Sequence, residues 1–351
     1  MESTRELPSL LVRADADTIR GSGHIMRCLA LVQVWCARGG LVFFLTRCVN
    51  QDLRERIQAA GASFLPLVGN ADLETTLLSM TEVKASFVVL DGYDFDLDYQ
   101  RALRTAGCPL MVIDDIVRLP CYEADILLNQ NLGAVHLGYN CNADAALLLG
   151  PEYALVRREF VVWRSRLHTV PETARKILVT LGGSDADNLT LKVIHALRQL
   201  EIARLQIRVV AGPANPHIEE LRDAVGAFSG NMELLTSVAE MAALMSWADL
   251  AVTGAGSTCW ELACVGLPAV TLVIAENQRA IAEELGAAGV VFNLGWHEEV
   301  SAERIATTVD GLLYSSFRRL RMSQTGRAVV DGKGAERVAA TLSKRLGVRA
   351  A

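Results

Sequence analysis

Short runs of Val, Ile and Leu alternate with longer stretches of helical period along nearly the whole chain, and this alternation limits the possible folds more than any other feature. A strand in a parallel sheet reads as a continuous apolar run, because helices cover both of its faces. Repetition of strand and helix is typical of such sheets. The sequence therefore predicts an α/β fold.

The apolar runs expected to form strands are 9–13, 41–46, 63–67, 86–91, 109–113, 126–128, 146–149, 176–181, 206–211, 231–235, 250–253, 269–273 and 290–293. Helical patterns lie between them, for example over 24–38, 51–60 and 96–106.

Two domains are expected, because 351 residues exceed what one hydrophobic core usually supports. The strand pattern restarts after a polar stretch, 164–175, that carries Pro171 and several charges. We therefore predict two Rossmann-like domains, 1–168 and 169–351, with a cleft between them and the last helices packing back on the first domain.

Composition excludes several classes of protein. The hydrophobic fraction is 51%, yet no segment approaches the roughly 18 uninterrupted apolar residues of a membrane span. The first residues show neither a basic nor an apolar leader, so we expect a cytoplasmic chain without membrane insertion. A net charge of -6 argues against nucleic acid as a partner. The eight cysteines form no zinc-like spacing and are expected to be reduced thiols.

Glycine loops follow three of the expected strands, at 21–24, 181–185 and 254–258. Ligands of open parallel sheets bind at the carboxyl ends of strands, and the first turn of a helix offers unpaired N–H groups to an anion. None of the loops continues as G-x-G-x-x-G, so a dinucleotide site is not supported. A single such loop is more typical of a tight turn than of a ligand site. Three together favour a diphosphate, held between the two loops of the second half.

His24 opens a strongly apolar helix directly after the first glycine loop. A histidine at this position can point into a cleft and act as a general base, with Asp15 or Asp17 as the carboxylate that orients it. The alternative is a histidine that only caps the helix.

Other polar residues have two readings each. Asp15-Ala16-Asp17 resembles a metal-binding pair, but carboxylates in this pattern more often pair with arginine, and Arg13, Arg20 and Arg27 are close in the sequence. We expect no metal and no cofactor.

The segment from Thr258 to Glu261 fits a capping box, in which Glu261 returns to the cap, and a ligand ribose is the rival partner of Glu261. Tyr93 and Asn277-Gln278 follow strands and either reach the cleft or lie in turns.

Taken in order, these motifs resemble the family of UDP-2,4-diacetamido-2,4,6-trideoxy-β-L-altropyranose hydrolases of pseudaminic acid biosynthesis and their spore-coat polysaccharide relatives. The motifs that carry the resemblance are 13–15, 21–30, 91–93, 113–115, 149–155 with 158–160, 181–185 with Asn188, 256–262 and 275–278. The family is similar to glycosyltransferases with two Rossmann-like domains, the GT-B architecture, and works without a metal.

The resemblance implies a role for each matching residue. His24 would activate water for attack on the anomeric carbon of a UDP-sugar. The residues expected at the substrate are Arg13, Asp15, Gly21, Gly23, Tyr93, Asn277 and Gln278. The residues expected at UDP are Gly182, Gly183, Ser184, Asn188, Gly256, Ser257, Thr258 and Glu261, the last of these at the ribose.

The function predicted from the sequence is hydrolysis of a UDP-sugar to UDP and a free acetamido-trideoxy sugar, by a monomer or weak oligomer. Two alternatives remain open. One is a glycosyltransferase that uses the same donor, with a hydroxyl in place of water. The other is a protein that binds a nucleotide sugar without turning it over.

Overall fold

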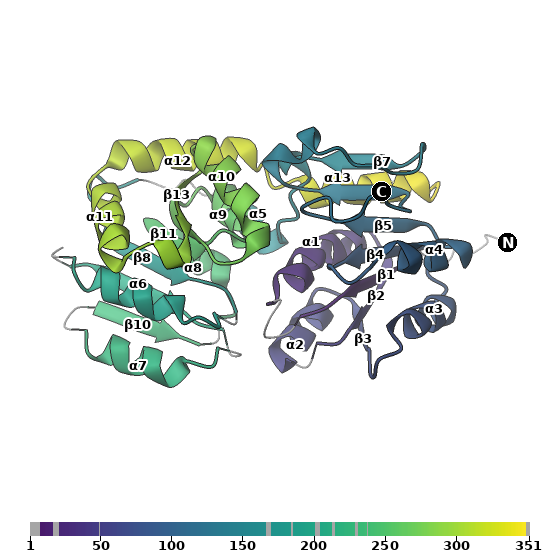
Figure 1. Ribbon diagram of the computed structural model, residues 1–351, viewed down its shortest axis with the longest axis horizontal. Coiled ribbons are helices and arrows are strands. Elements are labelled where there is room, and N and C mark those ends of the chain that lie inside the picture. The colour runs from purple at the N-terminus through teal and green to yellow at the C-terminus, as the bar shows by residue number, and fades with distance from the viewer. Residues whose placement is uncertain are drawn as a thin grey trace. The chain divides into compact units, whose positions relative to one another are not determined.

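The computed structural model describes residues 8–16, 21–48, 50–165, 170–183, 185–200, 204–212, 215–228, 231–236 and 238–348. The chain divides into two compact units (Figure 1). The first contains residues up to Arg157 together with those from Lys333 onward, and the second runs from Arg158 to Gly332.

The first unit is built on a parallel sheet in the order β3-β2-β1-β4-β5-β6-β7. Its strands are β1 (Ser9–Ala14), β2 (Leu41–Thr46), β3 (Ser63–Pro66), β4 (Phe87–Asp91), β5 (Leu110–Ile113), β6 (Ile126–Asn129) and β7 (Ala146–Leu149). The order reverses between β1 and β4, which are hydrogen-bonded neighbours although β2 and β3 lie between them in the sequence. Such a reversal is the place where an open α/β sheet binds its ligand.

Helices cover both faces of this sheet, as Figure 1 shows. On one face the core joins the strands to α1 (Gly23–Ala37), α2 (Gln51–Ala59) and α13 (Gly334–Arg345). On the other it joins them to α3 (Asp72–Glu82) and α4 (Leu97–Thr105). Two short 3-10 helices, η1 (Leu132–His136) and η2 (Pro151–Tyr153), lie in the later loops.

The second unit repeats the plan with a parallel sheet in the order β10-β9-β8-β11-β12-β13. Its strands are β8 (Lys176–Thr180), β9 (Gln206–Val210), β10 (Asn231–Leu235), β11 (Leu250–Gly254), β12 (Ala269–Val273) and β13 (Val291–Trp296). The order reverses between β8 and β11, so the loops that follow these two strands start side by side.

The helices of the second unit are α5 (Arg158–Arg164), α6 (Leu189–Leu197), α7 (Ile218–Gly226), α8 (Met241–Trp247), α9 (Thr258–Val265), α10 (Arg279–Ala287), α11 (Ala302–Leu313) and α12 (Ser316–Val329), with η3 (Glu276–Gln278) and η4 (His297–Glu299). Leu189, Val193 and Leu197 of α6 and Ile305 and Val309 of α11 share one core.

The predicted fold class is confirmed: two Rossmann-like α/β units are present, and every expected strand is found within a residue or a few of its predicted ends. The division falls after Arg157, ahead of the polar stretch in which the sequence placed it. The reason is that α5 packs against α8 and α9 of the second unit.

Helix α13 belongs to the first unit, where Val338, Ala339 and Leu342 are fully buried in the core beside α1. Gly334 opens this helix directly against η2. A Cβ at Gly334 would lie 2.2 Å from the carbonyl oxygen of Ala154, which is backbone and cannot rotate away. Glycine therefore permits the contact that seats the C-terminal helix.

We predict that Gly334→Val lowers the free energy of unfolding of the first unit by about 1–3 kcal/mol, the usual cost of overpacking. Hydrogen exchange of peptides from α13 and α1 measures it. Gly138→Ala is the control, because no atom lies within 4 Å of the added Cβ, and its effect should stay within about 0.5 kcal/mol. Equal protection of α13 in wild type and Gly334→Val would contradict the packing argument.

Candidate functional site

The sheet reversal of the first unit brings His24 and Asp91 together. His24 lies in the first turn of α1, after β1, and Asp91 is the last residue of β4. The β1–β4 register places Ala14 beside Asp91, so the chain leaves both strands at one edge of the sheet. Residues 67 apart in the sequence therefore meet there.

The His24 Nδ1 atom lies 2.7 Å from Asp91 Oδ1. A carboxylate only accepts hydrogen bonds, so Nδ1 carries the proton and the neutral ring keeps its lone pair on Nε2. The His24 side chain retains 10% of its accessible surface, whereas that of Asp91 is fully buried. A buried carboxylate behind a slightly exposed imidazole is the arrangement of an oriented general base.

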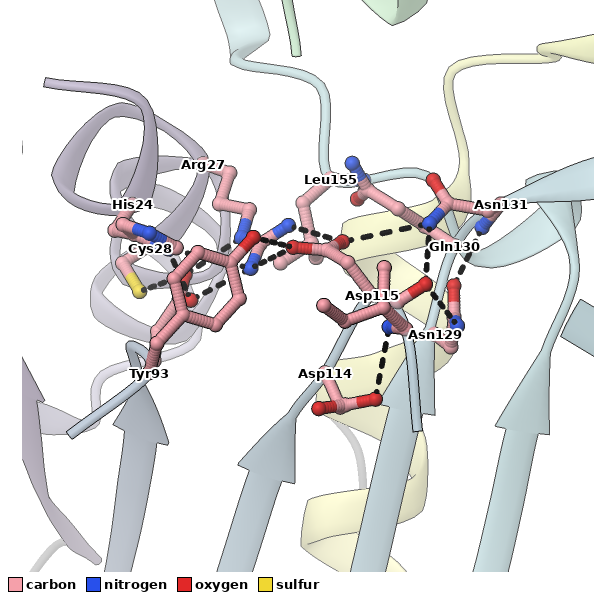
Figure 2. A network of polar contacts seen from close by, with 12 residues as sticks. His24, Arg27, Cys28, Tyr93, Asp114, Asp115, Asn129, Gln130, Asn131 and Leu155 are labelled. Atoms are coloured by element: carbon pink, nitrogen blue, oxygen red, sulfur yellow. Dashed lines mark hydrogen bonds and ion pairs between the residues drawn. The ribbon is translucent and has the colours of Figure 1, made fainter. Parts of the chain in front are cut away.

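Arg27, one turn further along α1, holds two carboxylates at once. Its Nε and Nη2 atoms donate to Asp91 over 2.6 Å each, and its Nη1 and Nη2 atoms donate to Asp115 over 2.8 and 3.1 Å. Asp115 is the second residue after β5. One guanidinium thus ties α1 to the chain at the ends of β4 and β5. Figure 2 shows Arg27 and Asp115 of this cluster facing each other.

Both carboxylates are ionised. Burial acts to raise the pKa of Asp91, but the charge of Arg27 and the contact with His24 outweigh it and hold that pKa far below the ordinary 3.8. Burial likewise acts to raise the pKa of Asp115, and Arg27 again lowers it. The same two carboxylates raise the pKa of Arg27 against the effect of its burial. The cluster therefore keeps its charges down to acidic pH.

Tyr93 joins this cluster from the loop after β4. Its hydroxyl donates to Asp115 Oδ2 over 3.1 Å, and its ring meets the His24 ring edge-on, with 5.1 Å between the centroids and 85° between the planes. The phenol is half-buried. The structure thus brings Tyr93 next to His24.

Arg13 and Asp15 form a separate ion cluster. Arg13 is fully buried and donates to Asp15 over 2.5 and 2.7 Å and to Asp72 of α3. Side chains of a strand alternate between its faces, and Arg13 points with Leu11 toward the α3 and α4 side of the sheet. Asp91 points with Val89 toward α1. The expectation that Asp15 orients His24 is therefore corrected in favour of Asp91; Asp17 lies outside the described residues.

Gly21 and Gly23 flank Ser22, the N-cap of α1. Gly21 has φ +69°, and Ser22 makes no side-chain cap bond. The first turn of α1 contains no acidic residue. The positive end of the helix therefore meets no carboxylate of its own first turn.

In the second unit the loop after β8 caps its own helix. Gly182 has φ +99°, and the two Asp185 carboxylate oxygens accept from the amides of Leu189 and Thr190 over 2.9 Å each. These amides open α6, so its N-terminus is already neutralised. Gly183 precedes this cap, and Ser184 lies outside the described residues.

Asn188 is the N-cap of α6, with φ +50°. Its Nδ2 atom donates to Glu220 of α7 over 2.7 Å. Asn188 and Glu220 line a cavity of ≈ 470 Å³ together with His195 and His217. The Asn188 side chain is thus hydrogen-bonded to Glu220 of α7.

The loop after β11 leads into α9, and the N-terminus of this helix has no side-chain cap. Ser257 is the N-cap of α9 and makes no side-chain cap bond. Cys259 and Trp260 donate to carbonyl groups within the same turn, and the amides of Ser257 and Thr258 have no hydrogen-bond partner in the described part of the chain. Gln278 lies against this loop, because a Cβ at Gly256 would be 3.4 Å from its Nε2. Of the two helix N-termini that follow β8 and β11, that of α9 is therefore the one with amides open to an anion.

The start of α9 bears on the predicted capping box. A capping box needs its acidic residue three positions after the cap, and the third residue after Ser257 is Trp260. The predicted box from Thr258 to Glu261 is therefore not formed by the N-cap of this helix. Glu261 lies in the first turn and is half-buried. Asn277 lies in η3, beside Gln278.

Some polar residues at the first sheet were not recognised from the sequence. Asn129, Gln130 and Asn131 follow or end β6, all nearly fully buried, and the Asn131 side chain donates to the backbone carbonyl of Asp115 over 3.3 Å. Three consecutive amide side chains at the end of an apolar strand were the available signal.

In the described ranges, no group of three or more His, Cys, Asp or Glu side chains is arranged to hold a metal ion. In the same ranges, no helix combines the length and apolarity needed to span a bilayer.

Comparison with known proteins gives a family match for the second half of the chain. Residues 176–338 match the family described as glycosyltransferase family 28 C-terminal domain. The chain is 26% identical over 331 residues to spore coat polysaccharide biosynthesis protein SpsG of Bacillus subtilis, covering 94% of this chain and 96% of that protein. It is 33% identical over 175 residues to a UDP-N-acetylglucosamine–N-acetylmuramyl-(pentapeptide) pyrophosphoryl-undecaprenol N-acetylglucosamine transferase of Alkalilimnicola ehrlichii, covering 48% of this chain and 47% of that protein.

Solved structures share the whole architecture. Acinetobacter baumannii MurG superimposes with a TM-score of 0.65 at 17% identity, covering 96% of this chain and 99% of that one. A Staphylococcus aureus MnaA–UDP structure gives a TM-score of 0.70 at 13% identity, covering 98% of each chain. Such likenesses show the fold, which is the predicted two-domain GT-B type.

We predict that the stability of the first unit falls in acid through the Arg27 cluster. The folded pKa of Asp91 lies below its ordinary 3.8, so its contribution is complete above that value and is lost as the pH falls through the lower folded value. Asp91→Asn should therefore show a flatter loss of α1 protection between about pH 5 and pH 2, measured by hydrogen exchange. Parallel slopes for wild type and variant would contradict this assignment.

Proposed function

We propose that this chain is a UDP-sugar-dependent enzyme of polysaccharide biosynthesis that transfers the sugar from UDP to a hydroxyl acceptor, with His24 as general base. The observation that carries the proposal is the 2.7 Å contact between His24 Nδ1 and buried Asp91. It leaves Nε2 as the proton acceptor of the ring. The match of residues 176–338 to a glycosyltransferase domain supports the reaction class.

The second unit would hold UDP. The glycosyltransferase from Alkalilimnicola ehrlichii has UDP-N-acetylglucosamine in its name, and the MnaA structure contains UDP. The open amides of Ser257 and Thr258, with Gln278 beside them, suit the diphosphate. Glu261, one turn further along α9, would accept hydrogen bonds from the ribose hydroxyls. The α6 loop contributes less to charge neutralisation, because Asp185 occupies its helix end.

In the proposed reaction the acceptor oxygen forms a bond to the anomeric carbon while the bond from that carbon to the β-phosphate oxygen breaks. His24 Nε2 takes the acceptor's proton, and UDP leaves with the bonding electron pair. Asp91 stabilises the imidazolium that forms, without taking the proton itself. Helix N-terminal amides stabilise the charge that develops on UDP.

Hydrolysis is the second candidate, with water as the acceptor. The motif that surrounds His24, residues 21–30, is among those that resemble the UDP-sugar hydrolases, and the matched glycosyltransferase domain does not include it. The two candidates share the donor, the base and the bond that breaks.

A panel of UDP-sugars followed by NMR distinguishes them. Transfer predicts little release of UDP until a hydroxyl acceptor is added. Hydrolysis predicts stoichiometric UDP and free sugar without one, with ¹⁸O from labelled water on the sugar and none on UDP. Label on the β-phosphate would contradict the placement of His24, and binding of UDP-sugars without any turnover would indicate a non-catalytic binding protein.

Substitutions should separate base from nucleotide site. His24→Ala is expected to lower turnover by about 10²-fold or more and to leave UDP affinity nearly unchanged, because the two sites belong to different units. Glu261→Gln should weaken UDP binding, measured by calorimetry, with a smaller effect on turnover. If His24→Ala and Glu261→Gln lowered UDP affinity equally, the division of roles would be wrong.

A further inference from the structure

The buried cluster around His24 carries an excess of negative charge. Asp91 and Asp115 contribute two negative charges and Arg27 one positive charge, and Arg27 and Asp115 expose only 7% and 8% of their surface. With a neutral His24 ring the sum is one negative charge. When the ring takes a proton, the cluster becomes neutral.

We infer that Asp115, which does not touch His24, sets how strongly this ring holds a proton and is a positioning residue for the base. The inference rests on the proposed role of His24. Asp91 contacts the ring, but Arg27, the cation that the described residues place beside it, opposes a charge on the ring from 3.4 Å between Nη2 and Nδ1. Arg27 makes two hydrogen bonds to each carboxylate. Asp115 therefore neutralises part of the guanidinium charge, and Asp91 keeps more of its own negative charge available to stabilise a protonated ring.

The other described groups beside the ring leave this charge count unchanged. Burial raises the pKa of the Cys28 thiol, which donates toward Asp91, so the thiol stays neutral. Tyr93 contributes a neutral phenol that donates to Asp115. From the end of β6, Asn131 contributes a neutral amide (Figure 2). With Arg27 balancing one of the two carboxylates, Asp115 is the one that adds negative charge without touching the ring.

Asp114 provides a matched control next to it in the sequence. Its carboxylate accepts from the amides of Ile116 and Val117 and from the Tyr139 hydroxyl. In Figure 2 it lies apart from the Arg27 guanidinium. Asp114→Asn and Asp115→Asn each remove one negative charge from the chain, but only Asp115→Asn removes a charge from the His24 cluster.

The test is the titration of the His24 ring protons by NMR, with the signal assigned by its absence in His24→Gln. For Asp115→Asn we expect the midpoint to move to lower pH by about one pH unit, the size expected for one charge at the effective dielectric of a protein interior. Asp114→Asn should move it by less than a third of that. Asp115→Glu, which keeps the charge, should return it toward wild type.

A double variant separates charge from structure. Arg27→Gln combined with Asp115→Asn keeps the net charge at minus one, so the midpoint should lie at or above that of wild type. This variant also carries the test if Asp115→Asn alone does not fold. A midpoint that falls in the double variant, or that stays fixed in folded Asp115→Asn, would overturn the inference.

The pH profile of kcat/KM distinguishes this inference from the proposed function. If His24 is the base, the acid limb of the profile moves with the ring titration in Asp115→Asn. If the ring titration moves and the acid limb does not, Asp115 still controls His24, and the proposed catalytic role of His24 is wrong.

Discussion

The clamp that Arg27 makes on Asp91 and Asp115 is the interaction on which the first unit's site depends. Two carboxylates buried at neighbouring strand ends would repel each other and lose hydration without a cation between them. A planar guanidinium can bond both at once, which a lysine ammonium cannot do with the same geometry. By fixing Asp91, the clamp also fixes the hydrogen bond that orients His24. Arg27 therefore holds the ends of two strands together and also fixes the carboxylate that orients His24.

In the second unit, the proposed function requires a site for the negative charge of a diphosphate. Its two central loops look alike in sequence, since both carry glycine, serine and a following helix. The structure distinguishes them, because Asp185 closes the N-terminus of α6 with its own carboxylate, whereas α9 starts at a serine that makes no cap bond. An anion should therefore approach α9, with the α6 loop shaping the space beside it.

The strands could be predicted because burial on both faces leaves an unbroken apolar run, which needs only local sequence to be seen. His24 could be singled out for its place after a glycine loop. Its partner could not, because Asp15 and Asp91 both lie at the carboxyl ends of strands, and only the register and the alternation of faces decide between them. The same holds for Arg27, which the sequence offered as one of three possible partners of Asp15 and Asp17 and which instead bonds two aspartates far along the chain.

The most direct test of the account is the tautomer of the His24 ring, read from ¹⁵N chemical shifts of the labelled protein at neutral pH. The arrangement of Asp91 predicts a proton on Nδ1 and a bare Nε2, which is the atom required to accept a proton from the acceptor. A ring with its proton on Nε2 would contradict the proposed base, because no lone pair would then remain at that atom.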